Sequence, residues 1–313
     1  MSDVVTLGET MALVKADQPG PLAQAHALSL AIGGAESNFA VAAARLGASV
    51  TWVGRVGRDS LGDLVLRELR AEGLDVVGVR DDEAPTGLML KERRTADQLR
   101  VWYYRHGSAG SRLRPADVPE AAVTGARLLH VTGITPALSE DAAAAVAHAV
   151  RLARSAGVLV SFDLNYRSKL WSPAEAAPAF RTLAAQADVV FAGEDEAAIA
   201  VGPGTADALA RRLAELGPAQ VVLKQGAAGA YALVDGVEHE QAALAVTPVD
   251  TVGAGDGFVA GYVAELLAGL GVAERLATAV RVGAFACLVP GDWEGMPTRD
   301  ELGILDQVEA VSR

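Results

Sequence analysis

Residues 249–258 read VDTVGAGDGF, which places three glycines around one aspartate, Asp256. Apolar residues recur at the helical period directly afterwards, at Phe258, Val259, Tyr262, Val263, Leu266, Leu267 and Leu270. This spacing predicts a helix that begins near Gly253. A helix end has free backbone N–H groups and the positive end of the helix dipole, so the glycine turn is expected to form a site for an anion.

Asp256 falls in the first turn of this predicted helix. A carboxylate there would repel a bound phosphate, unless it accepts a proton from a hydroxyl while N–H groups stabilise the transferred group. The combination indicates phosphoryl transfer to an alcohol, with Asp256 as general base and the amides of Gly253, Ala254, Gly255 and Asp256 as the anion hole. The glycines do not fit G-x-G-x-x-G and come late in the chain, which disfavours a nicotinamide enzyme.

The rest of the chain alternates short β-rich runs with helical stretches. Strands are predicted at 4–9, 50–57, 128–133, 158–165, 188–193 and 220–226, with a hairpin at 230–234 and 238–245. Helices are predicted at 139–156, from about 173, across 194–217, at 253–270 and at 272–288. This alternation predicts an α/β fold with a mostly parallel central sheet that helices cover on both faces.

Two stretches break the alternation. Residues 11–32 and 86–106 read as strand pairs without helices, the second with a charged turn near residues 95–97. We expect them to form a small antiparallel sheet that suits an active-site lid, with an ordinary edge hairpin as the alternative. The predicted division is an α/β domain over 1–10, 33–85 and 107–313 and a β lid over 11–32 and 86–106.

Composition narrows the class of protein. The chain has 313 residues, 51% of them hydrophobic, which is enough for one large α/β domain without disulfides. Its net charge is −12 and it has no basic stripe, so neither nucleic acid nor an anionic membrane is an expected partner. The single cysteine, Cys287, and the absence of a signal-peptide pattern predict a cytoplasmic protein.

The segment DTVGAGDGF resembles the C-terminal signature of the ribokinase-like (PfkB) carbohydrate kinases, and GGAESNFAVAAARLG at 33–47 resembles their Gly-Gly sugar-binding turn. The resemblance covers essentially the whole chain, including the two-part lid. It implies a three-layer α/β/α domain with a small antiparallel β lid, and it implies ATP and Mg²⁺ as cofactors. It places Gly34 and Asn38 at the sugar.

The segment SFDLNYR alternates, so Asp163, Asn165 and Arg167 are expected on one side of a strand end, where open α/β sheets bind ligands. A solvated loop is the alternative from the residues alone. The resemblance implies that Asn165 lies near the ATP phosphates and Arg167 near substrate and phosphate. It assigns four further residues to the ATP site, namely Glu194, Lys224, Gly226 and Gly229.

A metal role rests on Glu196. Relatives have N-x-x-E in this segment, with the Glu ordering magnesium-bound water, and Glu196 occupies that position. Gly193 stands where the relatives have Asn, which departs from their pattern.

The substrate class follows from the lid and from the C-terminal segment. Tyr103 and Arg105 share one strand face, and this pair suits a polyol that carries a carboxylate, because Arg binds carboxylate in bidentate fashion. The segment VPGDWEGMPTRDEL at 289–302 resembles family members that act on 2-keto-3-deoxygluconate, which implies that Asp292 approaches a substrate hydroxyl. Met89 stands where some relatives have an aromatic residue.

Together these features predict an ATP-dependent kinase that phosphorylates the terminal (C6) hydroxyl of 2-dehydro-3-deoxy-D-gluconate. This is another name for the 2-keto-3-deoxygluconate mentioned above. One alternative is a fructokinase- or ribokinase-like kinase of a neutral sugar, and another is a catalytically silent sugar-binding regulator. The exposed edges of the lid predict a homo-oligomer, either a dimer or a multiple of dimers.

Overall fold

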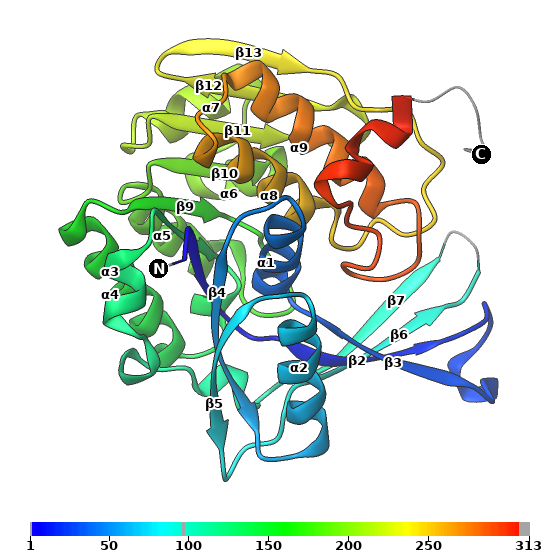
Figure 1. The fold of residues 1–313 in the computed structure, drawn as a ribbon. Coiled ribbons are helices and arrows are strands. Elements are labelled where there is room, and N and C mark those ends of the chain that lie inside the picture. Colours follow the sequence, from blue (N-terminus) through cyan, green and yellow to red (C-terminus); the bar gives the residue numbers. More distant parts are fainter. Residues whose placement is uncertain (1, 96–97, 307–313) are drawn as a thin grey trace.

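The computed structural model describes residues 2–95 and 98–306, and these contain a nine-stranded main sheet (Figure 1). Its strands are β1 (Val4–Leu7), β4 (Val50–Gly57), β5 (Asp75–Asp81), β8 (Leu128–Thr132), β9 (Leu159–Asp163), β10 (Val189–Gly193), β11 (Gln220–Lys224), β12 (Ala230–Val234) and β13 (Val237–Gln241). The order is β13-β12-β11-β10-β9-β8-β1-β4-β5. Neighbours are parallel from β5 to β11 and antiparallel beyond it, which confirms the predicted mostly parallel sheet.

Helices cover both faces of the main sheet, and each face has its own buried apolar cluster. The first face carries α1 (Ala35–Arg45), α2 (Ser60–Ala71), α8 (Ala254–Leu267) and α9 (Val272–Ala286). The second carries α3 (Glu120–Gly125), α4 (Glu140–Ala156), α5 (Pro173–Ala184), α6 (Glu194–Val201) and α7 (Ala206–Ala214). Short 3₁₀ turns lie at η1 (Leu22–Gln24), η2 (Gly110–Arg112), η3 (Pro115–Asp117), η4 (Thr135–Ala137), η5 (Gly226–Ala228) and η6 (Arg299–Asp306).

Local signals explain where the longest of these helices begins and ends. The Ser139 hydroxyl accepts a hydrogen bond from the N–H of Ala142 at 3.0 Å and caps the start of α4. Gly157 follows the helix in the left-handed region with φ of 72°, which ends it. No helix in the described part of the chain has the length and apolar character needed to cross a membrane.

A second sheet of four strands, the lid sheet, projects from the main body (Figure 1). It contains β2 (Met11–Ala16), β3 (Leu28–Gly33), β6 (Leu88–Arg93) and β7 (Leu99–Tyr104) in the order β3-β2-β6-β7. The pairs β2–β3 and β6–β7 are antiparallel as predicted, but the central pair β2–β6 is parallel. The lid sheet is therefore mixed and not purely antiparallel. Its central strands β2 and β6 run in the same direction. Part of the predicted turn, residues 96–97, lies outside the described residues.

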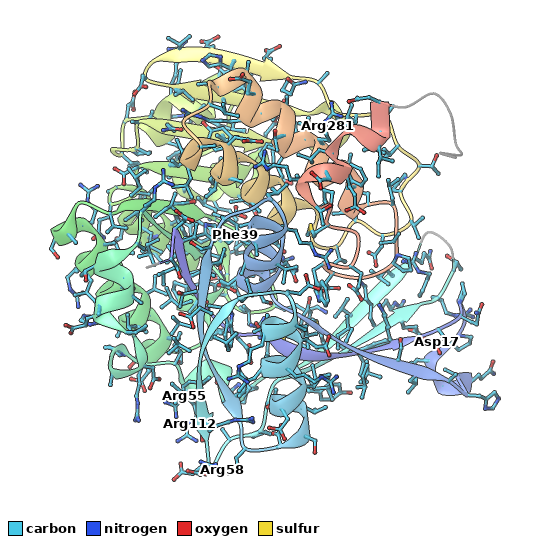
Figure 2. The ribbon with its side chains drawn as sticks, viewed as in Figure 1. Asp17, Phe39, Arg55, Arg58, Arg112 and Arg281 are labelled. Atoms are coloured by element: carbon cyan, nitrogen blue, oxygen red, sulfur yellow. The ribbon has the colours of Figure 1, made fainter. Side chains whose placement is uncertain are left out.

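An ion-pair cluster joins the β4–β5 edge of the main sheet to the loop before α3. The buried guanidinium of Arg55 on β4 lies 2.8 Å from Asp81 of β5 and 2.8 Å from Asp117. Arg112 adds a contact of 3.2 Å to Asp81, and Figure 2 shows Arg55 and Arg112 close together at this edge. This cluster holds the edge of the sheet together at a distance from the lid.

The strand order reverses between β1 and β8. The chain builds β4 and β5 on one side of β1 and then returns to build β8 to β11 on the other. In open α/β sheets, ligands bind outside the carboxyl ends of the strands at such a switch point. The topology therefore predicts that the functional site lies at the loops after β1, β8, β9 and β11.

Candidate active site

A cavity of about 1230 Å³ lies at this edge, between the main body and the lid sheet. The loops after β1, β8 and β9, the end of β11 and the start of α8 line it, and β6 and β7 contribute from the lid. The structure brings most of the predicted site residues together here, namely Gly34, Asn38, Tyr103, Arg105, Asn165, Arg167, Glu196, Lys224, Gly253, Gly255, Asp256 and Asp292. Ala254, Glu194, Gly226 and Gly229 are not among the residues that line it.

The start of α8 has the predicted glycine turn. Gly253 precedes the helix with φ of 80°, and a Cβ added there would lie 1.8 Å from the carbonyl oxygen of Asp292, so no larger residue fits. The N–H of Ala254 donates to the carbonyl of Thr251 at 3.3 Å, and this amide is therefore not free for an anion. Among the described residues, the N–H groups of Gly253, Gly255 and Asp256 have no hydrogen-bond acceptor. The available anion hole is narrower than the sequence predicted.

Asp256 is buried and accepts hydrogen bonds from two amides. Asn38 Nδ2 donates to one carboxylate oxygen at 2.8 Å, and Asn165 Nδ2 donates to the other at 3.3 Å. Burial raises the pKa of Asp256 to about 6, against the opposing effect of the Asn38 hydrogen bond. A carboxyl group with this pKa is mostly ionised at pH 7 and can still take up a proton, which suits a general base.

Asn38 has a free acceptor as well. Its Oδ1 is buried and has no hydrogen-bond partner among the described residues. A buried polar atom without a partner is costly, and such atoms occur where a ligand or water completes the hydrogen bond. Asn38 thus orients the Asp256 carboxylate with its nitrogen and presents an oxygen that a sugar hydroxyl can satisfy.

Lys224 ends strand β11 beside Asp256. Its ammonium lies 2.7 and 2.8 Å from the two carboxylate oxygens of Asp163, at the end of β9. Burial raises the pKa of Asp163 to about 6, although the charge of Lys224 opposes the rise. Lys224 lines the cavity, so it places a positive charge where phosphate charge is expected.

Strand β9 ends earlier than the sequence predicted. It stops at Asp163, and Asn165 has φ of 40°, in the left-handed region. The prediction that Asn165 and Arg167 lie on the same side of a strand as Asp163 assumed that the strand continues. It does not apply beyond Asp163, because the chain turns there. The turn still brings Asn165 to Asp256, and Arg167 still lines the cavity.

Glu196 caps α6 and binds the loop after β9. Its two oxygens accept the N–H of Tyr166 at 2.9 Å and the N–H of Gly193 at 2.7 Å. The described residues contain no group of three or more His, Cys, Asp or Glu side chains that could hold a metal ion. Glu196 is thus well ordered at the edge of the cavity, and its remaining lone pairs can accept from a water.

The other predicted nucleotide residues lie along the end of β11. Glu194 accepts a hydrogen bond from Gln225 Nε2 at 2.7 Å. Gly226 and Gly229 have φ of 57° and 109°, and a Cβ at Gly229 would lie 2.0 Å from the carbonyl oxygen of Gln241. The backbone packing of the β12–β13 hairpin is therefore enough to require glycine at Gly229.

The predicted carboxylate reader Arg105 already has a carboxylate partner. Its guanidinium lies 2.6 Å from Glu9, and its Nε donates to the same oxygen at 2.7 Å. The Ser108 hydroxyl also donates to Glu9. Glu9 lies just after β1, at the switch point of the sheet. An acidic residue directly after a strand is a sign of a site residue in an open α/β sheet, and Glu9 was not singled out from the sequence.

Arg167 differs from Arg105 in this respect. It is exposed, its guanidinium makes no hydrogen bond or ion pair with a described residue, and its charge lowers the pKa of Asp256. Nearby, Lys169 Nζ donates to the carbonyl of Val101 on β7 at 3.0 Å and lies 5.4 Å from the ring centre of Tyr103. Lys169 thereby ties the loop that carries Arg167 to the lid sheet.

Two further buried acids line the cavity. Glu36 on α1 accepts hydrogen bonds from Thr132 at 2.7 Å and Thr135 at 2.6 Å, and burial raises its pKa. Asp292 accepts from Lys91 at 2.9 Å, and burial raises the pKa of Asp292 against the effect of that charge. Asp292 was singled out from the sequence, but no role was predicted for Glu36, although Glu36 lies within the segment 33–47, or for Lys91, which lies in no motif.

Comparison with known proteins identifies what this chain is similar to. Residues 1–299 match the family described as pfkB family carbohydrate kinase. The chain is 39% identical over 304 residues to the 2-dehydro-3-deoxygluconokinase of Bacillus subtilis, covering 96% of this chain and 94% of that one. It is 36% identical over 294 residues to a 2-dehydro-3-deoxygalactonokinase of Haloferax volcanii, covering 93% and 92%. A crystal structure of a PfkB protein from Polaromonas sp. JS666 is 40% identical, with a TM-score of 0.88 over 97% of this chain and 99% of that one.

Proposed function

Because the chain belongs to the PfkB family of carbohydrate kinases, we propose that it transfers the γ-phosphoryl group of ATP to the C6 hydroxyl of 2-dehydro-3-deoxygluconate. The observation that carries the chemistry is the position of Asp256. Its carboxylate, with a pKa raised to about 6, lies at the start of α8 inside a cavity that the lid sheet covers. The protein is a sugar kinase, and the sugar acid is the proposed substrate.

In the proposed reaction the oxygen of the C6 hydroxyl attacks the γ-phosphorus of ATP, and Asp256 accepts the proton of that hydroxyl. The bond from that phosphorus to the bridging oxygen breaks, and ADP leaves with the electron pair. Negative charge on the transferring group is stabilised by the N–H groups of Gly255 and Asp256 and by the ammonium of Lys224. Asp256 then returns its proton to water.

Magnesium is proposed to enter with ATP. When bound, the ion neutralises charge on the β- and γ-phosphates, and Mg²⁺ usually keeps several waters and takes only one or two protein carboxylates. The residues present fit such a site, because Glu196 lines the cavity and uses one hydrogen bond per oxygen. Glu196 would hold a metal-bound water, and Asn165, Lys224 and the segment 226–229 would hold the nucleotide.

The sugar acid is proposed to bind between the lid and the main body. The guanidinium of Arg167 forms no ion pair with a described carboxylate, whereas that of Arg105 is paired with Glu9. Gly34, Tyr103 and Asp292 line the same space and complete the proposed pocket for the hydroxyl groups.

The test is a coupled ADP-release assay with ATP and Mg²⁺. It compares 2-dehydro-3-deoxygluconate with its galactonate epimer, fructose and ribose. We expect kcat/KM for a sugar acid to exceed that for a neutral sugar by about 100-fold, the size of one or two charge-assisted hydrogen bonds. Preference for fructose or ribose would support the neutral-sugar alternative, and no transfer to any sugar would support the silent regulator.

The two arginines give a sharper test of the acid. We expect Arg167→Ala to raise KM for the sugar acid by about tenfold or more while changing KM for a neutral sugar little, since it removes a guanidinium that has no ion-pair partner among the described residues. Arg105→Ala should weaken both kinds of sugar, because it leaves Glu9 buried without its partner. Equal losses on both sugars for Arg167→Ala would contradict its role as the carboxylate reader.

We also propose that the protein is a cytoplasmic homo-oligomer. Its one cysteine is free, which fits a reducing compartment. The outer face of the lid sheet is apolar, with Leu30, Val14, Leu90 and Trp102 aligned in one row across the four strands. Leu30 is 60% exposed and Tyr104, on the same face, 61%. A two-fold axis would cover this face with the same face of a second copy.

A further inference from the structure

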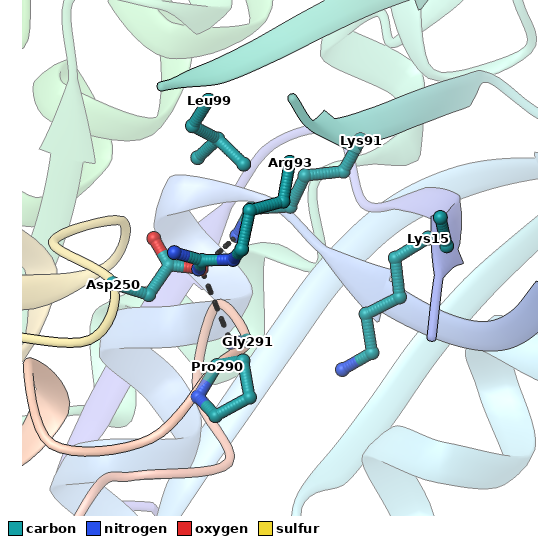
Figure 3. A pocket seen from close by; sticks show the side chains of 8 residues that line it. Lys15, Lys91, Arg93, Leu99, Asp250, Pro290 and Gly291 are labelled. Atoms are coloured by element: carbon teal, nitrogen blue, oxygen red, sulfur yellow. Dashed lines mark hydrogen bonds and ion pairs between the residues drawn. The ribbon is translucent and has the colours of Figure 1, made fainter. Parts of the chain in front are cut away.

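Lys91 on lid strand β6 bridges two buried acids of the main body. Its ammonium lies 2.7 Å from Asp250 and 2.9 Å from Asp292. The three side chains are only 5%, 1% and 6% exposed. Figure 3 shows the ammonium of Lys91 and the guanidinium of Arg93, from the same strand, converging on Asp250. The lid is thus joined to the main body by buried charges.

Asp250 shapes the turn that leads into α8. One of its carboxylate oxygens accepts the N–H of Val252 at 3.1 Å. The other, which Lys91 contacts, accepts the N–H of Gly291 at 3.3 Å. Gly253, the residue before α8, follows Val252 directly. The carboxylate that Lys91 holds therefore also fixes the backbone just ahead of the anion hole.

Asp292 contacts the same turn from the other side. Its carbonyl oxygen packs against Gly253, where a Cβ would lie 1.8 Å away. Its side chain lies against Gly33, where an added Cβ would be 2.4 Å from the carboxylate. Both acids that Lys91 bridges thus contact the chain segment from which the N–H groups of Gly255 and Asp256 extend.

We infer that Lys91 is a positioning residue of the phosphoryl-transfer site, which ties lid strand β6 to the turn 250–253 so that the anion hole keeps its geometry while the lid covers the cavity. Without the ammonium, the buried carboxylate of Asp292 loses its ion pair, and Asp250 keeps its contact of 3.4 Å with Arg93. A buried carboxylate that loses its partner moves or takes up water. The lid would then hold the turn less firmly, through Arg93 alone of these two cations. The catalytic consequence rests on the proposed function, whereas the structural tie does not.

The chain offers a matched control in Lys15. Lys15 on β2 is the register partner of Lys91 on β6, so the two lysines lie side by side on the same face of the lid sheet. Lys15 forms its own ion pair with Glu294 at 2.7 Å. Lys15→Met removes a lid-to-loop ion pair that is more exposed than those of Lys91, and it removes no contact to Asp250 or to the turn.

Hydrogen exchange of the backbone amides in 250–256 tests the tie without any substrate. We expect exchange in the Lys91→Met protein to be about tenfold faster than in the wild type, and in Lys15→Met to be unchanged, because local opening follows the loss of local contacts. Lys91→Gln, which keeps hydrogen-bond donors, serves where Lys91→Met does not fold. Equal exchange in the Lys91 and Lys15 variants would overturn the inference.

Kinetics then test the consequence. We expect kcat to fall about tenfold or more in Lys91→Met with KM for ATP changed less than about threefold, since a misplaced anion hole loses transition-state contacts. The Asp250→Asn/Lys91→Met double variant should lose little more than either single variant, because the two residues act together. Additive losses would contradict action through Asp250. If the wild-type protein is inactive on every sugar, the proposed function is refuted. The hydrogen-exchange result still tests the structural tie, because it does not depend on activity.

Discussion

At the residue scale, one carboxylate carries the proposed chemistry because its surroundings change its pKa. Burial raises the pKa of Asp256 to about 6, and the hydrogen bond from Asn38 and the charges of Arg167 and Lys224 limit the rise. The ionised form dominates at neutral pH, so the group accepts a proton from a hydroxyl without a large population of the inactive acid. Burial, one amide donor and two nearby cations thus set the pKa of this base.

The pH dependence follows from this value. Asp256 must be ionised to accept the proton, so kcat/KM should fall about tenfold per pH unit below pH 6 and level off above pH 7. We expect Asp256→Asn to lower kcat by about 10²- to 10⁴-fold while ATP binding, measured by calorimetry, is retained. The residual activity of that variant should show no fall near pH 6. A fall that persists there would assign the titration to Asp163, whose pKa is also raised to about 6.

At the element scale, the position of α8 depends on a single backbone conformation. Gly253 has φ of 80° and fits against the carbonyl of Asp292 with no room for a side chain. A residue with a Cβ would have to shift the first turn of the helix, and with it the amides of Gly255 and Asp256.

We therefore expect Gly253→Ala to reduce kcat by about 100-fold, since anion-hole donors lose their alignment, and to lower the free energy of unfolding by about 1–3 kcal/mol. The control is Gly269→Ala just beyond the other end of α8, where φ is 77° but a Cβ would meet nothing within 4 Å. That variant should carry the backbone strain alone and keep normal turnover. Denaturant unfolding and the ADP-release assay separate the two effects. Similar kcat losses in both variants would contradict a local role for Gly253.

At the scale of the whole molecule, the lid sheet has two different faces. The inner face carries Met89, Lys91 and Tyr103, which line the cavity. The outer face carries the exposed apolar row that includes Leu30 and Trp102, and Trp102 of the edge strand β7 also borders the cavity. One thin sheet therefore closes the site on one side, and its other side is the surface that we propose for contact with a second copy.

We expect Leu30→Glu to reduce the molar mass in solution, measured by light scattering, from that of an oligomer toward that of one chain, because it buries a charge at the proposed contact. Val237→Glu on β13 is the control, since Val237 is 58% exposed at the far edge of the main sheet. It should leave the mass unchanged. A wild-type protein that is monomeric at micromolar concentration would contradict the proposed contact.

Much of the fold could be predicted because its signals are local. The strand at 50–57 matches β4, and the helix at 139–156 matches α4 to within one residue, since periodicity and capping residues act over short distances. The end of β9 was predicted too late, because an apolar and polar alternation continues through Asn165 although the backbone turns there. The parallel pairing of β2 with β6 was also missed, since paired residues such as Lys15 and Lys91 are 76 positions apart in the chain and no local signal relates the directions of the two strands.

The sequence by itself determined the α/β architecture, the glycine turn before α8 and the identity of Asp256, because each depends on residues close together in the chain. Only the tertiary structure decided which charges neutralise one another. Arg105 is paired with Glu9 and Arg167 is not, and Lys91 reaches Asp292 across 201 positions. These pairings follow from strand order and from how the lid meets the main body. Because burial in that arrangement sets the pKa values and the partners, the working chemistry of the site could be read only from the folded molecule.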